Sequence, residues 1–585
     1  MSRRTCTAFA LMIWTVAPPL SAQECQDGVV RDLVIEREKP FVAEAAPDAR
    51  LGWLFRTMNA FHVRTRERTI RWELLFAESE CYDPSRITES ERTLRELPYI
   101  LDAGVDAEPH PDGGYRVLVR TQDSWAASAG AAFSFDEGVT LTGIRASAKN
   151  VLGTGTRGSL FRSSFRERKR TGLLVRQPNF LGTRVDATLS GGKAQPDRFW
   201  LFSFLRPYSG EVGAMAFRQT YSRRDDYFSY SAGPTQPYTQ AYARVDAERW
   251  TAQLQRRFGD PSGARVVAGV GFSRTSLVVP GDGFSAVFDN NFDDPTDGVP
   301  GIAELLARQS SSVDVDRVFV SLGLRRIRFE EHRAIDALSA PQDVPMGVEL
   351  MLTAGPAVGS RGPVDALPWF GLRGSAAWGA RNVYGHVDVD VEGQRGSDGL
   401  RDVLYETRAL GYWKQTDRAG TTVRASIAGG HAHRHPFQLT LGGMEGVRGY
   451  VADAFPGGRR VLASLEQRTS VFGWDPGLAE FGFVFFADAG RMWAGDVPLG
   501  QDSGWRASMG GGVRLGLPKG GQDVLRIDVN VPVTPASEQS ATFRIYAEIF
   551  GLLDRRGWPS QMQRSRWFGL DTRLTRRPLD PLAGS

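Results

Sequence analysis

The sequence predicts an all-β transmembrane barrel of ~16 antiparallel strands, preceded by a small α+β domain. Three observations lead to this prediction. Residues 125–550 contain repeated segments in which apolar and polar side chains alternate. No apolar run of about 18 residues follows residue 22, which excludes a helical membrane protein. Residues 23–124 instead follow the order strand, helix, helix, strand, strand.

Residues 1–22 have the pattern of a secretory signal peptide. Arg3 and Arg4 precede an apolar run over residues 8–17, and Ala22 offers a small residue for cleavage. The apolar run is too short to cross a bilayer. We therefore expect an exported protein. The barrel predicted for residues 125–550 would place it in the bacterial outer membrane, with residues 23–124 in the periplasm.

Three cysteines occur in the chain, and Cys6 would be removed with the signal peptide. Cys25 and Cys81 would remain in a compartment that permits disulfides. From the sequence alone, a bridge between Cys25 and Cys81 and two independent thiols are equally compatible with the pattern.

The N-terminal domain, residues 23–124, begins with a strand at residues 29–35. Residues 65–76 predict an amphipathic helix with Thr65 as its N-cap, and a second helix begins at Asp83-Pro84 and ends near Leu97. Residues 99–106 and 115–121 predict a hairpin about the turn Pro111-Asp112-Gly113-Gly114.

The barrel, residues 125–550, follows from strict alternation such as Leu525, Ile527 and Val529 against Arg526, Asp528 and Asn530. A soluble sandwich and a membrane barrel both produce this alternation. The segments are about ten residues long, which suits a tilted membrane strand. Their polar faces carry full charges, which a soluble core would not accept unpaired. Tryptophans near the segment ends suit interface girdles. We therefore favour the barrel.

Composition and motifs exclude several functional classes. The chain has 585 residues with 71 basic and 67 acidic side chains. This balance lacks the excess of basic residues that is typical of nucleic-acid-binding proteins. The sequence lacks Gly-x-Ser-x-Gly, His-Glu-x-x-His and a phosphate-binding loop, so we expect no enzyme and no cofactor.

His431, His433 and His435 alternate but have no acidic or cysteine neighbour. We therefore expect a solvated strand end there and no metal site.

Several motifs resemble the BamA/TamA superfamily, also called the bacterial surface antigen family. Leu441-Gly442-Gly443-Met444-Glu445-Gly446-Val447-Arg448-Gly449-Tyr450 is similar to the family's signature loop. Ala463 to Glu466 and Phe486 to Trp493, which includes Asp488 and Gly490, resemble the two acidic strands that follow it. The segments 150–155 and 178–183 resemble the family's turns. Residues 23–124 look like one polypeptide-transport-associated (POTRA) domain of the family.

The chemistry of the segment 441–450, called the signature loop below, can be argued from its residues. A guanidinium folded into a barrel lumen loses water and needs a carboxylate partner. Glu466 and Asp488 lie on the polar faces of the next strands. We therefore expect Arg448 to bind both carboxylates and to tether the loop inside the lumen, as the resemblance also implies. The tether can serve transport or only hold the shape of the barrel.

The resemblance implies a protein that inserts or translocates client polypeptides through a lateral seam. The alternative is a passive or lipid-handling pore, or a surface antigen, with a fixed lumen plugged by its loop. The expected partners are outer-membrane lipid, lipopolysaccharide, and unfolded clients or a periplasmic protein at the N-terminal domain. Residues 551–585 form a C-terminal tail, assigned to the periplasm. The tail could also bind in the lumen, bind a partner or trail freely.

Overall fold

The computed structural model describes residues 25–574 with internal gaps. The gaps are residues 26, 41–55, 58, 61, 126, 135–139, 166–167, 195, 234–235, 289–295, 334, 336, 362–366, 444, 452–453, 471–478, 517–518, 521–523, 535–543 and 550–559. The predicted signal peptide and residues 575–585 therefore lie outside the described residues.

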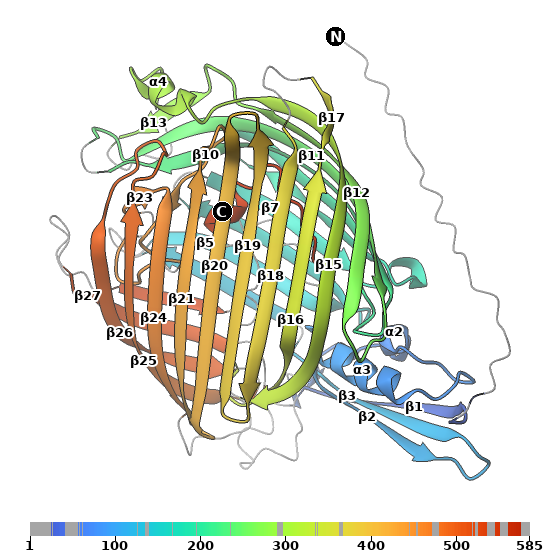
Figure 1. Ribbon diagram of the computed structural model, residues 1–585. Coiled ribbons are helices and arrows are strands. Elements are labelled where there is room, and N and C mark those ends of the chain that lie inside the picture. Colours follow the sequence, from blue (N-terminus) through green and yellow to red (C-terminus); the bar gives the residue numbers. More distant parts are fainter. Residues whose placement is uncertain are drawn as a thin grey trace.

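The N-terminal domain is a three-stranded sheet packed against two helices (Figure 1). Its elements are β1 (Val30–Glu38), α2 (Glu67–Glu73), α3 (Pro84–Arg95), β2 (Ile100–Pro109) and β3 (Tyr115–Asp123). β3 lies in the middle, parallel to β1 and antiparallel to β2. Apolar side chains from both helices and the sheet share one core, which gives this small domain its own packing. Cys25 and Cys81 are joined by a disulfide.

The first helix is shorter than the sequence suggested, and its predicted cap is wrong. Arg66 stands at the N-cap and makes no side-chain cap bond. Thr65 instead uses its amide and hydroxyl to donate to Asp123, at 2.8 and 2.6 Å. At the other end, Leu74 is extended and Ser90 accepts a hydrogen bond from the amide of Leu75, so the chain leaves the helix early.

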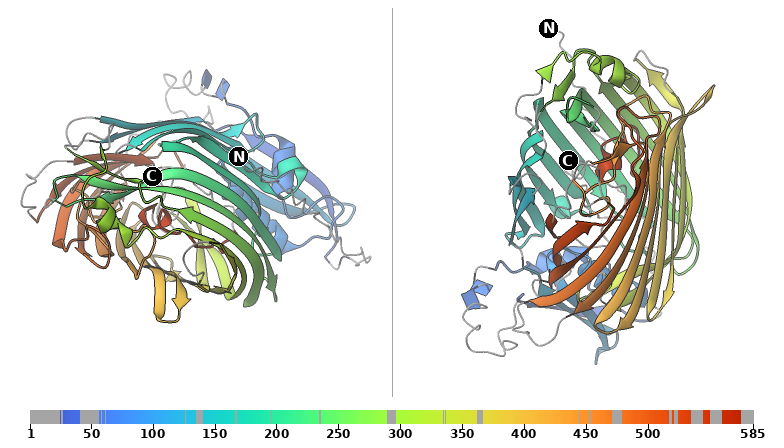
Figure 2. Two further views of the ribbon diagram at one scale, coloured as in Figure 1. Left: turned by 90° about the horizontal axis from the view of Figure 1, so that it is seen from above. Right: turned by 90° about the vertical axis from the view of Figure 1, so that its left-hand side faces the viewer.

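Among the described residues, twenty strands longer than four residues form one closed antiparallel barrel, whose ring is seen in Figures 1 and 2. They are β4 (Ala127–Ser134), β5 (Thr140–Val151), β6 (Thr156–Phe165), β7 (Arg168–Gln177), β8 (Asp186–Lys193), β9 (Pro196–Arg206), β10 (Met215–Ser231), β11 (Gln240–Phe258), β12 (Arg265–Val278), β15 (Val313–Arg333), β16 (Pro341–Gly355), β18 (Trp369–Ala380), β19 (Val383–Gly396), β20 (Gly399–Thr416), β21 (Ala419–His431), β24 (Arg459–Ser470), β25 (Glu480–Trp493), β26 (Gly504–Gly516), β27 (Val524–Pro532) and β28 (Arg544–Ile549). The expectation of ~16 strands was too low. Several strands have only eight to twelve residues and very short turns, such as the one between β18 and β19.

Three short elements, β13 (Phe284–Val287), α4 (Ile302–Ala307) and β17 (Ala357–Ser360), lie at the end of the barrel away from the N-terminal domain, which we call the far end (Figure 1). The other short strands are β14 (Thr296–Asp297), which pairs with β13, and β22 (Leu439–Thr440), which pairs with β23 (Pro456–Gly457). The opposite end, which contacts the N-terminal domain, is the domain end. Among the described residues, no helix has the length and hydropathy needed to cross a membrane.

The outer face of the wall is apolar and the inner face is polar. On β15, Val320, Leu322 and Leu324 are 58%, 60% and 58% exposed on the outside. Arg317 and Ser321 on the same strand are buried toward the lumen. This arrangement is the one expected for strands between lipid and lumen.

The described part of the C-terminal tail, residues 560–574, lies inside the ring (Figures 1 and 2). It contains α5 (Ser560–Gln563) followed by irregular chain. The assignment of the whole tail to the periplasm is therefore wrong for these residues, because they contact inward-facing side chains of the barrel.

Candidate functional site: a tethered lumen loop

The signature loop folds back on itself between β21 and β24. The amide of Val447 donates to the carbonyl of Leu441 at 2.7 Å, and the amide of Gly443 donates to the carbonyl of Tyr450 at 3.3 Å. A Cβ at Gly446 would lie 1.7 Å from the Leu441 carbonyl oxygen, and Gly449 has a φ of +93°. Both positions therefore require glycine for this close turn.

Arg448 is the centre of the site and is 7% exposed. Its Nε and one terminal nitrogen donate to the two oxygens of Asp488, at 2.6 and 2.8 Å. Its other terminal nitrogen lies 3.1 Å from Asp528 and 3.2 Å from Glu466. The guanidinium also lies over the ring of Phe486, 3.5 Å from the centroid. The structure thus brings Arg448 together with both carboxylates that the sequence suggested.

Three carboxylates and several arginines make the site a network. Glu466, which is fully buried, also pairs with Arg424 and, at 3.0 Å, with Arg468. Asp528 also pairs with Arg514. Burial alone would lower the pKa of Arg448, but Asp488, Glu466 and Asp528 hold it above its ordinary value. Arg448 therefore stays charged and is held by three wall strands, β24, β25 and β27.

Asp528 and Phe486 were missed as partners of Arg448. Asp528 was visible in the sequence as a polar residue of an alternating strand. Nothing in that pattern, however, indicated its height in the barrel relative to Asp488. Phe486 lies two residues before Asp488 on the same inward face, so the alternation alone could have identified it.

The other motif residues shape the space around the loop. Gly442 lies at the start of the turn and forms a β-bridge with Val447. Tyr450 is 1% exposed, and its hydroxyl lies 3.0 and 2.8 Å from the carbonyls of Ala507 and Thr534. A Cβ at Gly490 would lie 3.0 Å from Leu441, so this glycine leaves room for the loop. The carbonyl of Trp493 accepts a hydrogen bond from Gly458 at 3.1 Å.

The two asparagine turns of the sequence dock the N-terminal domain on the barrel. Asn150 donates to the hydroxyl of Thr65 at 2.8 Å, and the amide of Arg66 donates to the carbonyl of Gly153 at 2.8 Å. Asn179 donates to Glu73 on α2 at 2.7 Å. The turns therefore bind the start and the end of α2.

A second contact is centred on Glu211, between β9 and β10. Its amide donates to Glu89 on α3 at 2.6 Å, and its carboxylate pairs with Arg265, Arg325 and Arg257. Burial alone would raise the pKa of Glu211, but these guanidinium groups lower it to about 2. Glu211 is therefore ionised at neutral pH, and it links the wall to the domain.

The solvated strand end expected for the histidines is wrong for His433 and His435, which are 8% and 1% exposed. His433 stacks on Phe437, and His435 contacts Phe568 of the tail edge-on. Burial lowers the pKa of His433 to about 4. Among the described residues, no group of three or more His, Cys, Asp or Glu side chains has a metal-binding arrangement.

One family model matches the part of the chain that contains this site. Residues 386–549 match the model of the Omp85 superfamily domain. Similar solved structures include BamA from Haemophilus ducreyi lacking POTRA domains 1–3, with 12% identity, 88% of this chain and 85% of that chain covered, and a TM-score of 0.39. CdiB from Escherichia coli shows 14% identity, 92% coverage of both chains and a TM-score of 0.36. No curated protein matches the sequence.

The matched stretch holds the signature loop and all three carboxylates that bind Arg448. Residues 386–549 of this chain therefore carry an Omp85 superfamily domain, which forms part of a ring of strands with an apolar outer face.

Proposed function

We propose that this protein assists the insertion or translocation of client polypeptides at the outer membrane through a lateral seam between β28 and β4. The observation that carries the proposal is the tether of Arg448 within the Omp85 superfamily domain. Its carboxylates come from β24, β25 and β27, and β27 is the neighbour of β28. The tether thus holds β24, β25 and β27 together through Arg448. Among the described residues, no partner of Arg448 lies on β28 or β4, so the tether does not oppose the separation of these two strands.

The order of the strands along the chain supports an opening at this place. β4 is the first strand of the ring and β28 is its last, so no turn joins this pair directly. The pair is held by its ladder hydrogen bonds and side-chain contacts, whereas strands that follow one another in the ring are also joined by the chain. A separated edge presents unpaired amides and carbonyls, on which an incoming client strand can form its own hydrogen bonds.

The N-terminal domain suits the capture of clients or of a periplasmic partner. β2 lies at one edge of its sheet, where an extended segment can add as a further strand. The contacts through Asn150, Asn179 and Glu211 hold this domain against the barrel. A client bound there would be kept at the domain end. We place this end in the periplasm and the outer wall against lipid and lipopolysaccharide.

One observation favours the alternative, a passive barrel with a fixed lumen. The signature loop and residues 560–574 both lie inside the ring. A protein that only holds such a filled lumen, as a closed pore, a lipid-handling protein or a surface antigen, would need no seam.

Paired cysteines distinguish the two functions. One cysteine is placed in β28 and one in β4, at positions scanned along both strands, in cells depleted of the native protein. The abundance of other outer-membrane proteins is then measured by proteomics. We expect a locked seam to deplete a set of clients and reduction to restore them.

The matched control locks β26 to β27 through Val513→Cys and Ile527→Cys, which are paired positions on the outer face. The unmodified protein with and without reductant controls for the Cys25–Cys81 disulfide. If every locked seam supports normal levels of all outer-membrane proteins, the barrel is passive and the proposal is wrong.

A further inference from the structure

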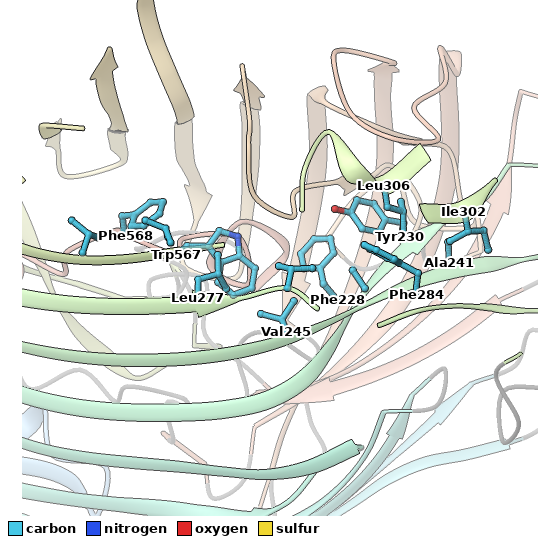
Figure 3. Packing of buried hydrophobic residues seen from close by; sticks show 14 of the residues in the cluster. Phe228, Tyr230, Ala241, Val245, Leu277, Phe284, Ile302, Leu306, Trp567 and Phe568 are labelled. Carbon is cyan, nitrogen blue, oxygen red and sulfur yellow. The ribbon is translucent and has the colours of Figure 1, made fainter. Parts of the chain in front are cut away.

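The C-terminal segment, residues 560–574, is packed into the lumen by apolar side chains. Trp567 and Phe568 join a cluster with Phe228 of β10, Leu277 of β12 and residues of α4 (Figure 3). Met562 is fully buried among side chains of the signature loop. Leu574 packs against β9 and β10. The segment therefore has an apolar contact near each of its ends and in its middle.

Arg566, Asp571 and Arg573 of the segment are each paired with an opposite charge on the wall. Arg566 donates twice to Glu392 on β19, at 2.9 and 2.6 Å. Asp571 pairs with Arg218 on β10 and lies 3.5 Å from Arg373 on β18. Arg573 lies 3.1 Å from Asp388 on β19. Because Arg218, Asp388 and Glu392 are each at most 5% exposed, these pairs are poorly screened by water.

The wall also binds the main chain of the segment. Gln253 and Gln255 of β11 donate to the carbonyls of Asp571 and Thr572, at 2.5 and 3.1 Å. Arg224 of β10 donates to the carbonyl of Arg564 at 3.0 Å. In the reverse direction, the indole of Trp567 donates to the carbonyl of Pro436, in the connection after β21, at 3.0 Å. Hydrogen bonds to the main chain of a peptide contribute to its affinity for a surface.

The segment thus connects two parts of the lumen. At its start, Gln561 accepts a hydrogen bond from the amide of Thr440, next to the signature loop, at 3.0 Å. Further along, it is bound to strands from β10 to β19. We propose that residues 560–574 are an intramolecular plug, and that the inner wall from β10 to β19 is a binding site for this peptide that closes the lumen until the peptide leaves.

The test measures ion conductance of the purified protein in planar lipid bilayers, without any client. A variant that ends at Pro559 lacks the plug. We expect its conductance to be several-fold higher than that of the full chain. A synthetic peptide of residues 560–574 should return the conductance to the original level, and a scrambled peptide of the same composition should not.

Charge reversal tests the binding site within the full chain. Arg566→Glu, in the tail and outside the wall, should raise conductance, and Glu392→Arg should do the same. The double variant should close again, because the ion pair is restored in the opposite sense. Arg223→Glu on β10 is the control, since Arg223 pairs with Asp246 at an exposed site. Only preparations with the compact electrophoretic mobility of a folded barrel are compared.

The inference is overturned if the truncated protein conducts like the full chain, if the scrambled peptide closes it equally well, or if the double variant stays as open as the single ones. None of these readouts depends on the seam. The plug and the proposed function can therefore fail independently.

Discussion

Removal of the Arg448 side chain tests the tether most directly. In Arg448→Ala, Asp488 would remain 5% exposed and would lose both hydrogen bonds from the guanidinium. Glu466 keeps Arg424 and Arg468, and Asp528 keeps Arg514. The main penalty is therefore one buried carboxylate left without its bidentate partner, which costs about 3–5 kcal/mol. Arg448→Lys keeps the charge but not the paired geometry, so it should fall between Ala and the native residue.

The assay is hydrogen exchange at the amide of Val447, which is bonded to the carbonyl of Leu441 within the loop. If opening of the loop limits exchange, a loss of about 3–5 kcal/mol speeds exchange by roughly two to four orders of magnitude. Amides in β15, far from the loop, should be unaffected. Arg491→Ala is the control, because Arg491 pairs with Asp502 at an exposed site and should leave the loop unchanged. Unchanged protection of Val447 in Arg448→Ala would refute the tether.

Three further predictions concern the N-terminal domain and its contacts. The pKa of Glu211 is lowered from 4.5 to about 2, so its ionised form stabilises the fold fully above pH 4.5 and this stabilisation is lost as the pH falls toward 2. The thermal unfolding midpoint of the native protein should therefore exceed that of Glu211→Gln at about pH 5, and the difference should vanish by about pH 2. Asn150→Ala removes the hydrogen bonds to Thr65 and from Gly155, each 2.8 Å long. It should weaken docking by about 1–3 kcal/mol and speed proteolysis near Thr65, and equal cleavage rates would contradict the docking role. The Cys25–Cys81 pair closes a separation of 56 residues, so Cys25→Ser with Cys81→Ser should destabilise the domain by about 2–5 kcal/mol in denaturant melts that leave the barrel folded.

The barrel and the tether could be predicted because both follow from local alternation. Alternation along β25 places Phe486 and Asp488 on the inward face, and alternation along β27 places Asp528 there. If Arg448 is buried in the lumen, few carboxylates other than those on these inward faces are available to pair with it. The order of elements in the N-terminal domain was equally visible, since caps, proline and turn residues mark the boundaries locally.

What the sequence did not reveal depends on contacts between distant residues. Arg218 and Asp571 are 353 positions apart, and the tail has no periodicity that points to a lumen. His433 and His435 looked solvated because the residues that cover them, such as Phe568, lie in that tail. Thr65 is a residue type that is common at helix N-caps. Its hydroxyl instead donates a hydrogen bond to the buried carboxylate of Asp123, which lies 58 positions away in the sequence.

The width of the ring explains why the end of the chain lies inside it. Side chains alone fill the interior of a barrel of about 8 strands, whereas 16 to 18 strands leave an aqueous channel. A ring of twenty strands therefore needs additional chain if its lumen is to be closed. If the lumen held only water, the inner wall would carry charged side chains, but these would not need to lie opposite charges of the other sign on the tail. Here Arg218, Asp388 and Glu392 each face the opposite charge on residues 566–573. That positional match is what a binding site requires, and it makes the tail a component of the lumen.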